Sequence, residues 1–270
     1  DTGAKGTVGH PTGEMNQPAP PGMLSPVDEP RSLEADEPRA LWERAAGWLV
    51  VGGATLVVLT ILNPGANLWP LGDIHFGKLF SDTTTNGGDM GAHIWWPRFL
   101  EENWFGKLRL SGWAPDWYAG FPAGQYYFPL PAVLIAAIDT LTPIPYEVAF
   151  KLVTVSGPLL LPAAAYSFAR GIRAPWPAPP MFAVAALATL VQTRTGWQIY
   201  GGNISSTLAG EFSFTLALAL GLFGLGALGR SLDTGKRAWL PAVLVAAAAM
   251  SHIVVAFFVG LMALLLWLVR

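Results

Sequence analysis

Apolar residues in this chain gather into runs separated by segments rich in proline, glycine and charged residues. An α-helix needs about 20 predominantly apolar residues to cross the hydrocarbon core of a bilayer. The pattern therefore predicts an all-α fold, that of a polytopic helical membrane protein. Its expected spans cover residues 42–62, 146–169, 177–193, 212–228, 239–250 and 253–269.

One apolar run, residues 131–141, is short for a full crossing and is bounded by prolines. It is either a half-helix that dips into the membrane or a short span. Basic residues follow alternate apolar runs at Arg170, Arg173, Arg230, Lys236, Arg237 and Arg270. These residues lie in the cytoplasm only if residues 131–141 do not cross, so the positive-inside rule favours the half-helix. The N-terminus is then cytoplasmic, and the protein is a multi-pass protein of the cytoplasmic (inner) membrane.

The last apolar stretch, residues 239–269, is too long for one span and too short for two full spans with a loop. It is expected to form a tight hairpin with Ser251 and His252 at its tip. An ionisable residue inside an apolar segment is by default a functional-site candidate. The alternative for His252 is a structural histidine satisfied by a neighbouring carbonyl.

Residues 1–40 are rich in proline, glycine and acids, with almost no apolar periodicity. Such a segment cannot bury enough surface to offset the entropy of ordering, so we expect a disordered cytoplasmic tail. No signal-peptide pattern precedes the first apolar run, which is therefore expected to be retained as an anchor. A chain that starts at Asp1 and ends at Arg270 after an apolar run is compatible with an N-terminal fragment of a longer protein.

Composition supports the membrane class. The chain is 52% hydrophobic and 13% charged, with a mean hydropathy of +0.42, whereas a soluble domain carries about 25% charged residues. A net charge of −2 gives no electrostatic reason to expect nucleic acid as a partner. The absence of cysteine excludes disulfides, thiolate metal sites and cysteine nucleophiles. No nucleotide-binding loop, HExxH, GxSxG or metal-spaced histidine cluster appears.

The connection between the first two full spans, residues 63–130, is long and aromatic and is expected to be extracytoplasmic. Indole rings favour the headgroup level of a membrane, and a connection of this length is more often functional than a plain linker. We expect short amphipathic helices that lie on the membrane surface and roof a cavity. The polar candidates within it are Asp89, His93, Arg98, Asp116 and Gln125.

Asp89 and His93 are four residues apart after a glycine pair, so a helix that begins at the glycines would present both on one face. Pro97 either interrupts this helix or begins a second one. The alternative role for Asp89 is to cap a surface helix.

Two further charged residues lie in or beside apolar runs. Glu211 stands at the start of an apolar helix, where a carboxylate serves either as a cap or as a functional acid. Lys151 lies within its span, either as a buried partner of Asp139 or Glu147 or as a contact for a lipid phosphate. Under the favoured topology, Glu211, the aromatic loop and His252 all face the same side of the membrane.

A family resemblance rests on the stretches AVLVAAAAMSHIVVAF, GDMGAHIWWPRFL, GWAPDWYAGFPAGQYYFPLP and GGNISSTLAGEFSF. One span, a long outer loop with an early acid, and a later hairpin resemble the polyprenyl-phosphate-dependent membrane glycosyltransferases of the GT-C type. More narrowly, the last three stretches look like the bacterial membrane proteins labelled as related to pyruvoyl-tetrahydropterin synthase. No zinc-binding histidine cluster for synthase chemistry is visible in the sequence.

The GT-C resemblance implies transfer of a sugar from a polyprenyl-phosphate donor to an extracytoplasmic cell-envelope glycan or lipid acceptor. Asp89 is then the implied catalytic base or metal contact, with Asp82 as the weaker candidate. Glu211 corresponds to an acid at the outer end of a middle span, and His93 completes the catalytic set beside Asp89. A divalent cation stays open as a cofactor, because the family pattern often shows two adjacent acids where this chain has one.

The resemblance also implies a substrate-binding set. His252 would contact the phosphate of the lipid carrier, aided by Arg98 or Lys151. The remaining candidates, which either contact sugar or anchor the loop, are Asp116, Gln125 and Tyr126, with Tyr127, Trp113 and Trp117. The expected partners are the lipid-linked donor, membrane lipid and the acceptor. The competing interpretation is a non-enzymatic transporter or envelope-assembly scaffold, in which His252 and Glu211 form a proton or substrate path.

Overall fold

The structure is a computed structural model that describes residues 2–3, 41–67, 75–103, 105–193 and 200–270. The chain divides into Asp1–Arg39 and a compact unit, Ala40–Arg270. The expected disordered tail lies outside the described residues, apart from positions 2 and 3. The compact unit is mostly helical over its described residues, as the hydropathy pattern predicts.

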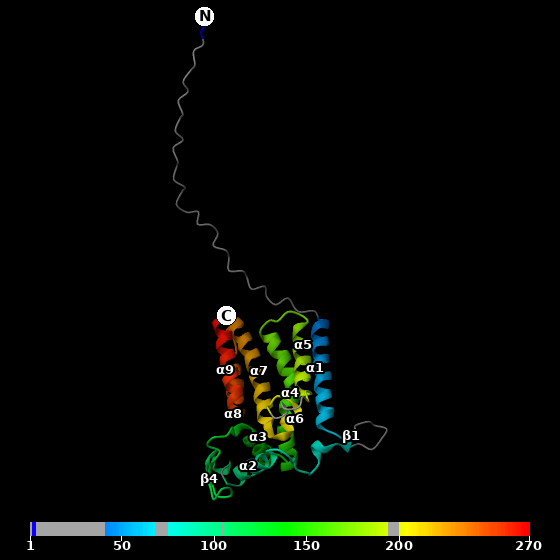
Figure 1. Cartoon of the computed structure of the whole chain (residues 1–270), viewed down its shortest axis with the longest axis vertical. Coiled ribbons are helices and arrows are strands. Elements are labelled where there is room, and N and C mark those ends of the chain that lie inside the picture. The colour runs from blue at the N-terminus through cyan, green and yellow to red at the C-terminus, as the bar shows by residue number, and fades with distance from the viewer. Residues whose placement is uncertain (1, 4–40, 68–74, 104, 194–199) are drawn as a thin grey trace. The chain divides into compact units, whose positions relative to one another are not determined.

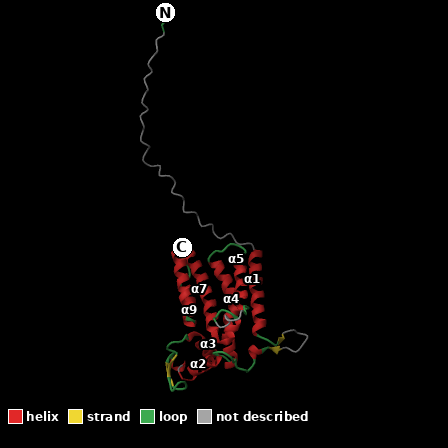
Figure 2. Cartoon of the chain, in the orientation of Figure 1, coloured by secondary structure: helices red, strands yellow, loops and turns green. Residues whose placement is uncertain are grey.

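Within the described part of the compact unit, the longer helices run side by side as a bundle (Figures 1 and 2). They are α1 (Leu41–Leu62), α4 (Tyr146–Gly171), α5 (Ala178–Leu190), α7 (Phe212–Thr234), α8 (Trp239–Ser251) and α9 (Ile253–Leu268). Helix α4 contacts α1, α5 and α7, and α7 packs in turn against α8 and α9. Helices α4 and α7 therefore form the spine of the bundle.

Three helices of the described residues are long and apolar enough to cross a membrane, namely α1, α4 and the continuous segment Ile204–Thr234 that contains α7. Helices α5, α8 and α9 are apolar but have only 13, 13 and 16 residues. At 1.5 Å per residue they are about 20–24 Å long, shorter than the roughly 30 Å hydrocarbon core. Whether these helices cross, and whether residues 131–141 dip or cross, stays a prediction.

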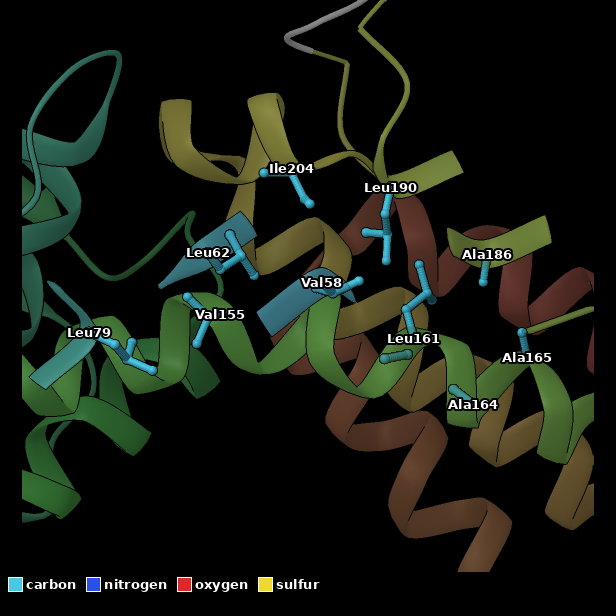
Figure 3. Close-up of a cluster of buried hydrophobic side chains, with 11 residues drawn as sticks. Val58, Leu62, Leu79, Val155, Leu161, Ala164, Ala165, Ala186, Leu190 and Ile204 are labelled. Atoms are coloured by element: carbon cyan, nitrogen blue, oxygen red, sulfur yellow. The ribbon is translucent and has the colours of Figure 1, made fainter. Parts of the chain in front are cut away.

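A core of buried apolar side chains holds α4 against its neighbours (Figure 3). Val58 of α1, Leu161 of α4 and Leu190 of α5 meet there and are at most 2% exposed. Glycine brings α4 and α7 close together, because a Cβ atom on Gly157 would lie 2.4 Å from the backbone nitrogen of Leu216. Small residues at helix crossings let backbones approach in this way.

The connection between α1 and α4 folds into short elements at one end of the bundle (Figure 1). They are β1 (Ala66–Asn67), β2 (His75–Phe76), the 3₁₀-helices η1 (Lys78–Phe80) and η2 (Phe105–Lys107), α2 (Met90–Asn103), β3 (Gly112–Ala114), β4 (Phe121–Ala123) and α3 (Pro129–Leu141). The antiparallel pairs β1–β2 and β3–β4 differ from the expectation of helices alone. Helix α2 continues through Pro97, which neither ends it nor begins a second helix.

A short irregular helical segment leads into α7. It consists of α6 (Ile204–Ser206) and a π-helical turn, η3 (Thr207–Glu211). The side chain of Asn203 caps its start by accepting a hydrogen bond from the backbone nitrogen of Ser206 at 2.7 Å. Gly210 has φ 126°, a conformation that side-chain-bearing residues rarely adopt, so it sets the kink at which α7 begins.

Ion pairs hold helix ends together on the other side of the bundle. Asp233 of α7 pairs with Arg173, which follows α4, at 2.9 Å, and with Arg270 after α9. Arg230 donates a hydrogen bond to the carbonyl of Ser167 at 3.3 Å. The loop elements and this basic cluster therefore lie at opposite ends of the bundle (Figure 1).

Candidate functional site

The start of α2 lies against the π-turn that precedes α7. The backbone nitrogen of Asp89 donates a hydrogen bond to the carbonyl of Ala209 at 2.8 Å. A Cβ atom on Gly88 would lie 2.0 Å from that carbonyl oxygen, and one on Gly210 would lie 3.0 Å from Asp89 Cβ and 3.3 Å from His93 Cδ2. The two glycines therefore allow the carboxylate and the imidazole to approach the start of α7.

Glu211 and His252 meet on the same side of α7. His252 Nε2 lies 3.9 Å from Glu211 Oε2. His252 has an extended backbone between α8 and α9 and so forms the tip of the expected hairpin. Its ring packs against Phe128 and Phe214, with centroid distances of 4.6 and 5.2 Å. Its Nδ1 is buried without a hydrogen-bond partner in the described part of the chain, so a ligand could reach this atom only after the neighbouring rings moved.

Tyr127 links the two histidines. Its hydroxyl lies 3.4 Å from His93 Nε2, and its ring contacts Phe128, which in turn packs on His252. Partial burial, together with the nearby carboxylates of Glu211 and Asp89, raises the pKa of Tyr127 to about 12. Tyr127 therefore stays protonated at neutral pH and can donate a hydrogen bond.

His93 is held in its neutral form. Burial lowers the pKa of His93 below its ordinary value of 6.5, against the opposing effect of the Asp89 carboxylate. The ring also packs edge-on against Phe212, with a centroid distance of 5.1 Å. A neutral imidazole can donate one hydrogen bond and accept another, but it does not neutralise the negative charge of the Asp89 carboxylate.

A pocket of about 250 Å³ opens beside this cluster. Its walls are formed by Asp89, Ala92, His93, Trp95, Trp96, Trp117, Phe121, Ala123, Gly124 and Tyr127. Helix α2 and the β3–β4 hairpin supply most of them, so the aromatic loop does form a concave surface. Asp89 and His93 line this pocket, whereas Glu211 and His252 lie beyond it, on the side of Tyr127 and Phe128.

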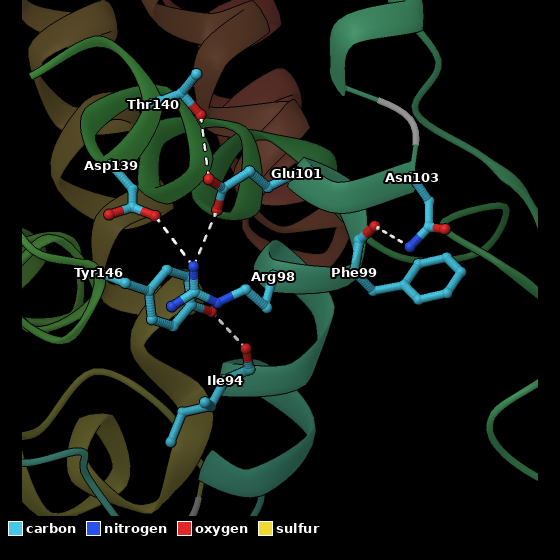
Figure 4. A network of polar contacts seen from close by, with 8 residues as sticks. All are labelled: Ile94, Arg98, Phe99, Glu101, Asn103, Asp139, Thr140 and Tyr146. Atoms are coloured by element: carbon cyan, nitrogen blue, oxygen red, sulfur yellow. Dashed lines mark hydrogen bonds and ion pairs between the residues drawn. The ribbon is translucent and has the colours of Figure 1, made fainter.

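Arg98 lies in a separate network that joins α2, α3 and α4 (Figure 4). Its Nη1 lies 3.3 Å from Asp139 Oδ2 and 3.6 Å from Glu101 Oε2, and its guanidinium carbon sits 3.9 Å from the ring centre of Tyr146. The Tyr146 hydroxyl donates to the carbonyl of Ile94. The described contacts of Arg98 thus anchor α2 to the bundle.

Lys151 also anchors the loop that joins α1 and α4. Its ammonium donates to the carbonyls of Lys78 and Ser81 at 2.8 and 2.6 Å, and to the Ser81 hydroxyl at 3.1 Å. These bonds fix the η1 turn to α4. The ammonium is therefore bonded to oxygens of the loop. The partners expected from the sequence were Asp139, Glu147 or a lipid phosphate.

The other predicted substrate contacts lie at the rim. Asp116 accepts a hydrogen bond from Trp95 Nε1 at 3.2 Å and so supports the pocket wall. Gln125 is exposed, and Tyr126 is 81% exposed. Both Tyr126 and Tyr127 were candidates from the sequence, and Tyr127 is the one of the two that lines the pocket. Only the turn geometry distinguishes two adjacent tyrosines, so no signal in the sequence separates them.

Metal binding is the cofactor question that the sequence leaves open. Within the described residues, no group of three or more histidine, aspartate and glutamate side chains is arranged to hold a metal ion. Mg²⁺ is usually held by one or two carboxylates together with substrate phosphates and water, so a cation that binds with its substrate needs no such group. The steps considered below use the side chains alone.

Comparison with known proteins gives one family. The model of the 6-pyruvoyl-tetrahydropterin synthase related domain, described as a membrane protein, matches residues 124–270, more than half of the chain. The match includes Tyr127, Glu211 and His252 and begins after Asp89 and His93. No curated protein and no solved structure matches the chain. The apolar helices agree with the membrane description, and the chain belongs to the family of 6-pyruvoyl-tetrahydropterin synthase-related membrane proteins.

Proposed function

We propose that this protein transfers a sugar from a polyprenyl-phosphate donor to an extracytoplasmic cell-envelope glycan or lipid acceptor, as a membrane glycosyltransferase of the GT-C type. One observation carries the proposal. Asp89, Glu211 and His252 come from segments far apart in the sequence, yet they gather around the start of α7 beside a pocket. A base, an orienting acid and a phosphate contact have a reason to meet in this way.

The proposed step is an inverting displacement. The acceptor hydroxyl oxygen attacks the anomeric carbon of the donor sugar, and the bond from that carbon to the lipid phosphate oxygen breaks. The Asp89 carboxylate takes the hydroxyl proton, and the phosphate leaves with the bonding electron pair. A base must lie within hydrogen-bond reach of the proton it removes, and Asp89 lines the pocket in which an acceptor could lie.

His252 supports the leaving group in this proposal. Its imidazole would donate a hydrogen bond to the lipid phosphate as negative charge develops there, which requires Nδ1, buried in the described structure, to become accessible when the donor binds. Glu211 Oε2, 3.9 Å from Nε2, orients the ring from its other side. Exposed apolar residues follow on the hairpin at Ile253, Val254 and Phe257, and these would lie along the prenyl chain.

In the proposed orientation the protein spans the cytoplasmic (inner) membrane several times, with its N-terminus in the cytoplasm. Basic residues lie at the end of the bundle where Asp233 pairs with Arg173 and Arg270. The loop elements lie at the opposite end (Figure 1), and helix α2 and the β3–β4 hairpin among them line the pocket. The positive-inside rule supports an extracytoplasmic pocket.

The test is turnover of polyprenyl-phosphate sugars by the purified full-length protein. Asp89→Asn should keep donor binding but lose at least about 10²-fold in turnover, the low end for removal of a general base. Asp82→Asn tests the weaker candidate for the base and should keep turnover, because Asp82 is exposed and does not line the pocket. His252→Ala should chiefly weaken donor binding. Wild-type turnover by Asp89→Asn would refute its role as base and leave the scaffold alternative ahead.

A further inference from the structure

The rings beside the pocket form a near-parallel set. Trp95 and Trp117 stack with a centroid distance of 4.9 Å and an interplanar angle of 27°. Trp117 and Phe121 follow at 6.2 Å and 23°, and Trp95 and Phe121 lie at 5.8 Å and 38°. The Trp95 indole is fixed further by its hydrogen bond to Asp116. Trp95 also stacks on Phe99 at 4.9 Å and 29°, so both of its faces are covered and Trp117 is the ring of this pair that can offer a face to a ligand.

Aromatic pockets favour two ligand classes, cations and sugar rings. A cation is attracted by the face of a single ring, and quaternary ammonium ligands are held by cages of several rings. Rings within 23–38° of parallel do not surround one point, so they do not form such a cage. A pyranose ring has an apolar face of C–H groups with slight positive charge, which suits the negative face of an aromatic ring.

The polar groups and the size of the pocket favour the same class. Asp89, His93 and the Tyr127 hydroxyl supply acceptors and donors on one side of the pocket, and sugar hydroxyls need both. The volume of about 250 Å³ is below the roughly 300–1,000 Å³ of pockets for drug-sized ligands. One sugar ring would therefore be bound, with the rest of a glycan outside.

We propose that the aromatic pocket binds one neutral pyranose ring of the acceptor, stacked on the face of Trp117 that Trp95 leaves free, with its reactive hydroxyl toward Asp89. This assignment rests on the proposed glycosyl transfer, whose base faces the pocket while His252 lies beyond Tyr127. The acceptor then enters from the aqueous side of the loop, and the lipid-linked donor from the hairpin. The substrate class is a glycan with a neutral hexopyranose at the accepting position.

The test measures binding of methyl pyranosides to the full-length protein in nanodiscs by saturation-transfer NMR. Choline is the cationic probe in the same experiment. Trp117→Ala should weaken pyranoside binding at least tenfold, and Trp117→Phe should retain most of it. Ala92→Phe should also abolish binding, because it fills the pocket and leaves every aromatic side chain in place. Trp113→Ala is the matched control, since Trp113 is 65% exposed on the same hairpin and does not line the pocket.

The outcomes separate this inference from the proposed function. Saturable choline binding without pyranoside binding, or unchanged pyranoside binding in Ala92→Phe, would overturn the sugar assignment. Loss of turnover in Asp89→Asn together with no pyranoside binding in the wild type would refute the acceptor pocket alone. Pyranoside binding with normal turnover in Asp89→Asn would refute the catalytic base and keep the sugar site.

Discussion

Gly88 offers the sharpest test of how the site is assembled. It precedes Asp89 with φ +51°, and a Cβ atom there would lie 2.0 Å from the carbonyl oxygen of Ala209. That same carbonyl accepts the hydrogen bond from the Asp89 backbone nitrogen at 2.8 Å. Gly88→Ala should therefore push the start of α2 away from the π-turn and carry Asp89 with it.

The magnitude follows from two costs. A left-handed backbone costs a residue with a Cβ atom about 1–2 kcal/mol. Overpacking of a fitted contact adds about 1–3 kcal/mol, and here both partners are backbone, which cannot rotate away. Gly88→Ala should lower the free energy of unfolding by about 2–5 kcal/mol. Turnover should fall as well, because a general base displaced by 1 Å loses its hydrogen-bond reach.

Gly91→Ala is the matched control. Gly91 lies on the same helix with nothing within 4 Å of a built Cβ atom, so alanine should raise helix stability by up to about 1 kcal/mol. Denaturant unfolding of both variants in the same detergent, followed by circular dichroism, gives the comparison. An unfolding midpoint for Gly88→Ala equal to that of the wild type would show that the close contact between Gly88 and the carbonyl oxygen of Ala209 is not formed.

Two further predictions concern the loop. Arg98→Met should lower the free energy of unfolding by about 1–3 kcal/mol, between the values for exposed and buried ion pairs, because it leaves Asp139 and Glu101 facing each other. The double variant with Asp139→Asn should recover part of the loss in thermal unfolding, and no recovery would argue against the pair. The pKa of His93 is lowered in the folded state, so around and below its unfolded value of 6.5 the unfolded chain binds more protons, and stability falls as the pH is lowered. His93→Gln should flatten the decrease of the melting temperature between about pH 7.5 and 5, and parallel curves for the two proteins would refute this assignment.

The helices of the bundle could be predicted from the sequence, because long apolar runs such as those around Val58 and Leu161 indicate buried segments. The meeting of Asp89, Glu211 and His252 at one end also follows from alternating spans, although their chemical roles stay predictions. The β3–β4 hairpin was not accessible, since strands of three residues are too short to show alternation.

Long-range backbone contacts explain the other misses. The partners of Lys151 are carbonyl oxygens 70 and 73 residues earlier in the chain, and carbonyls are present at every position, so nothing in the sequence marks them. Gly210 is one of 30 glycines, and only the fold shows that its left-handed turn accommodates Asp89 and His93. Side-chain patterns predict which faces are buried but not which backbone atoms meet.

The contacts that position the pocket side of the aromatic loop come later in the chain than the loop itself. Lys151 and Tyr146 lie in the first turns of α4, and the carbonyl that receives Asp89 belongs to Ala209. At about 5–20 residues per second, a ribosome needs about 6–24 s to proceed from Asp89 to Ala209. During that interval the nascent chain carries its tryptophans and its candidate base without the helices that hold them. The pocket can thus form only after Ala209 has been synthesised, although its own aromatic residues are made about 90–120 residues earlier.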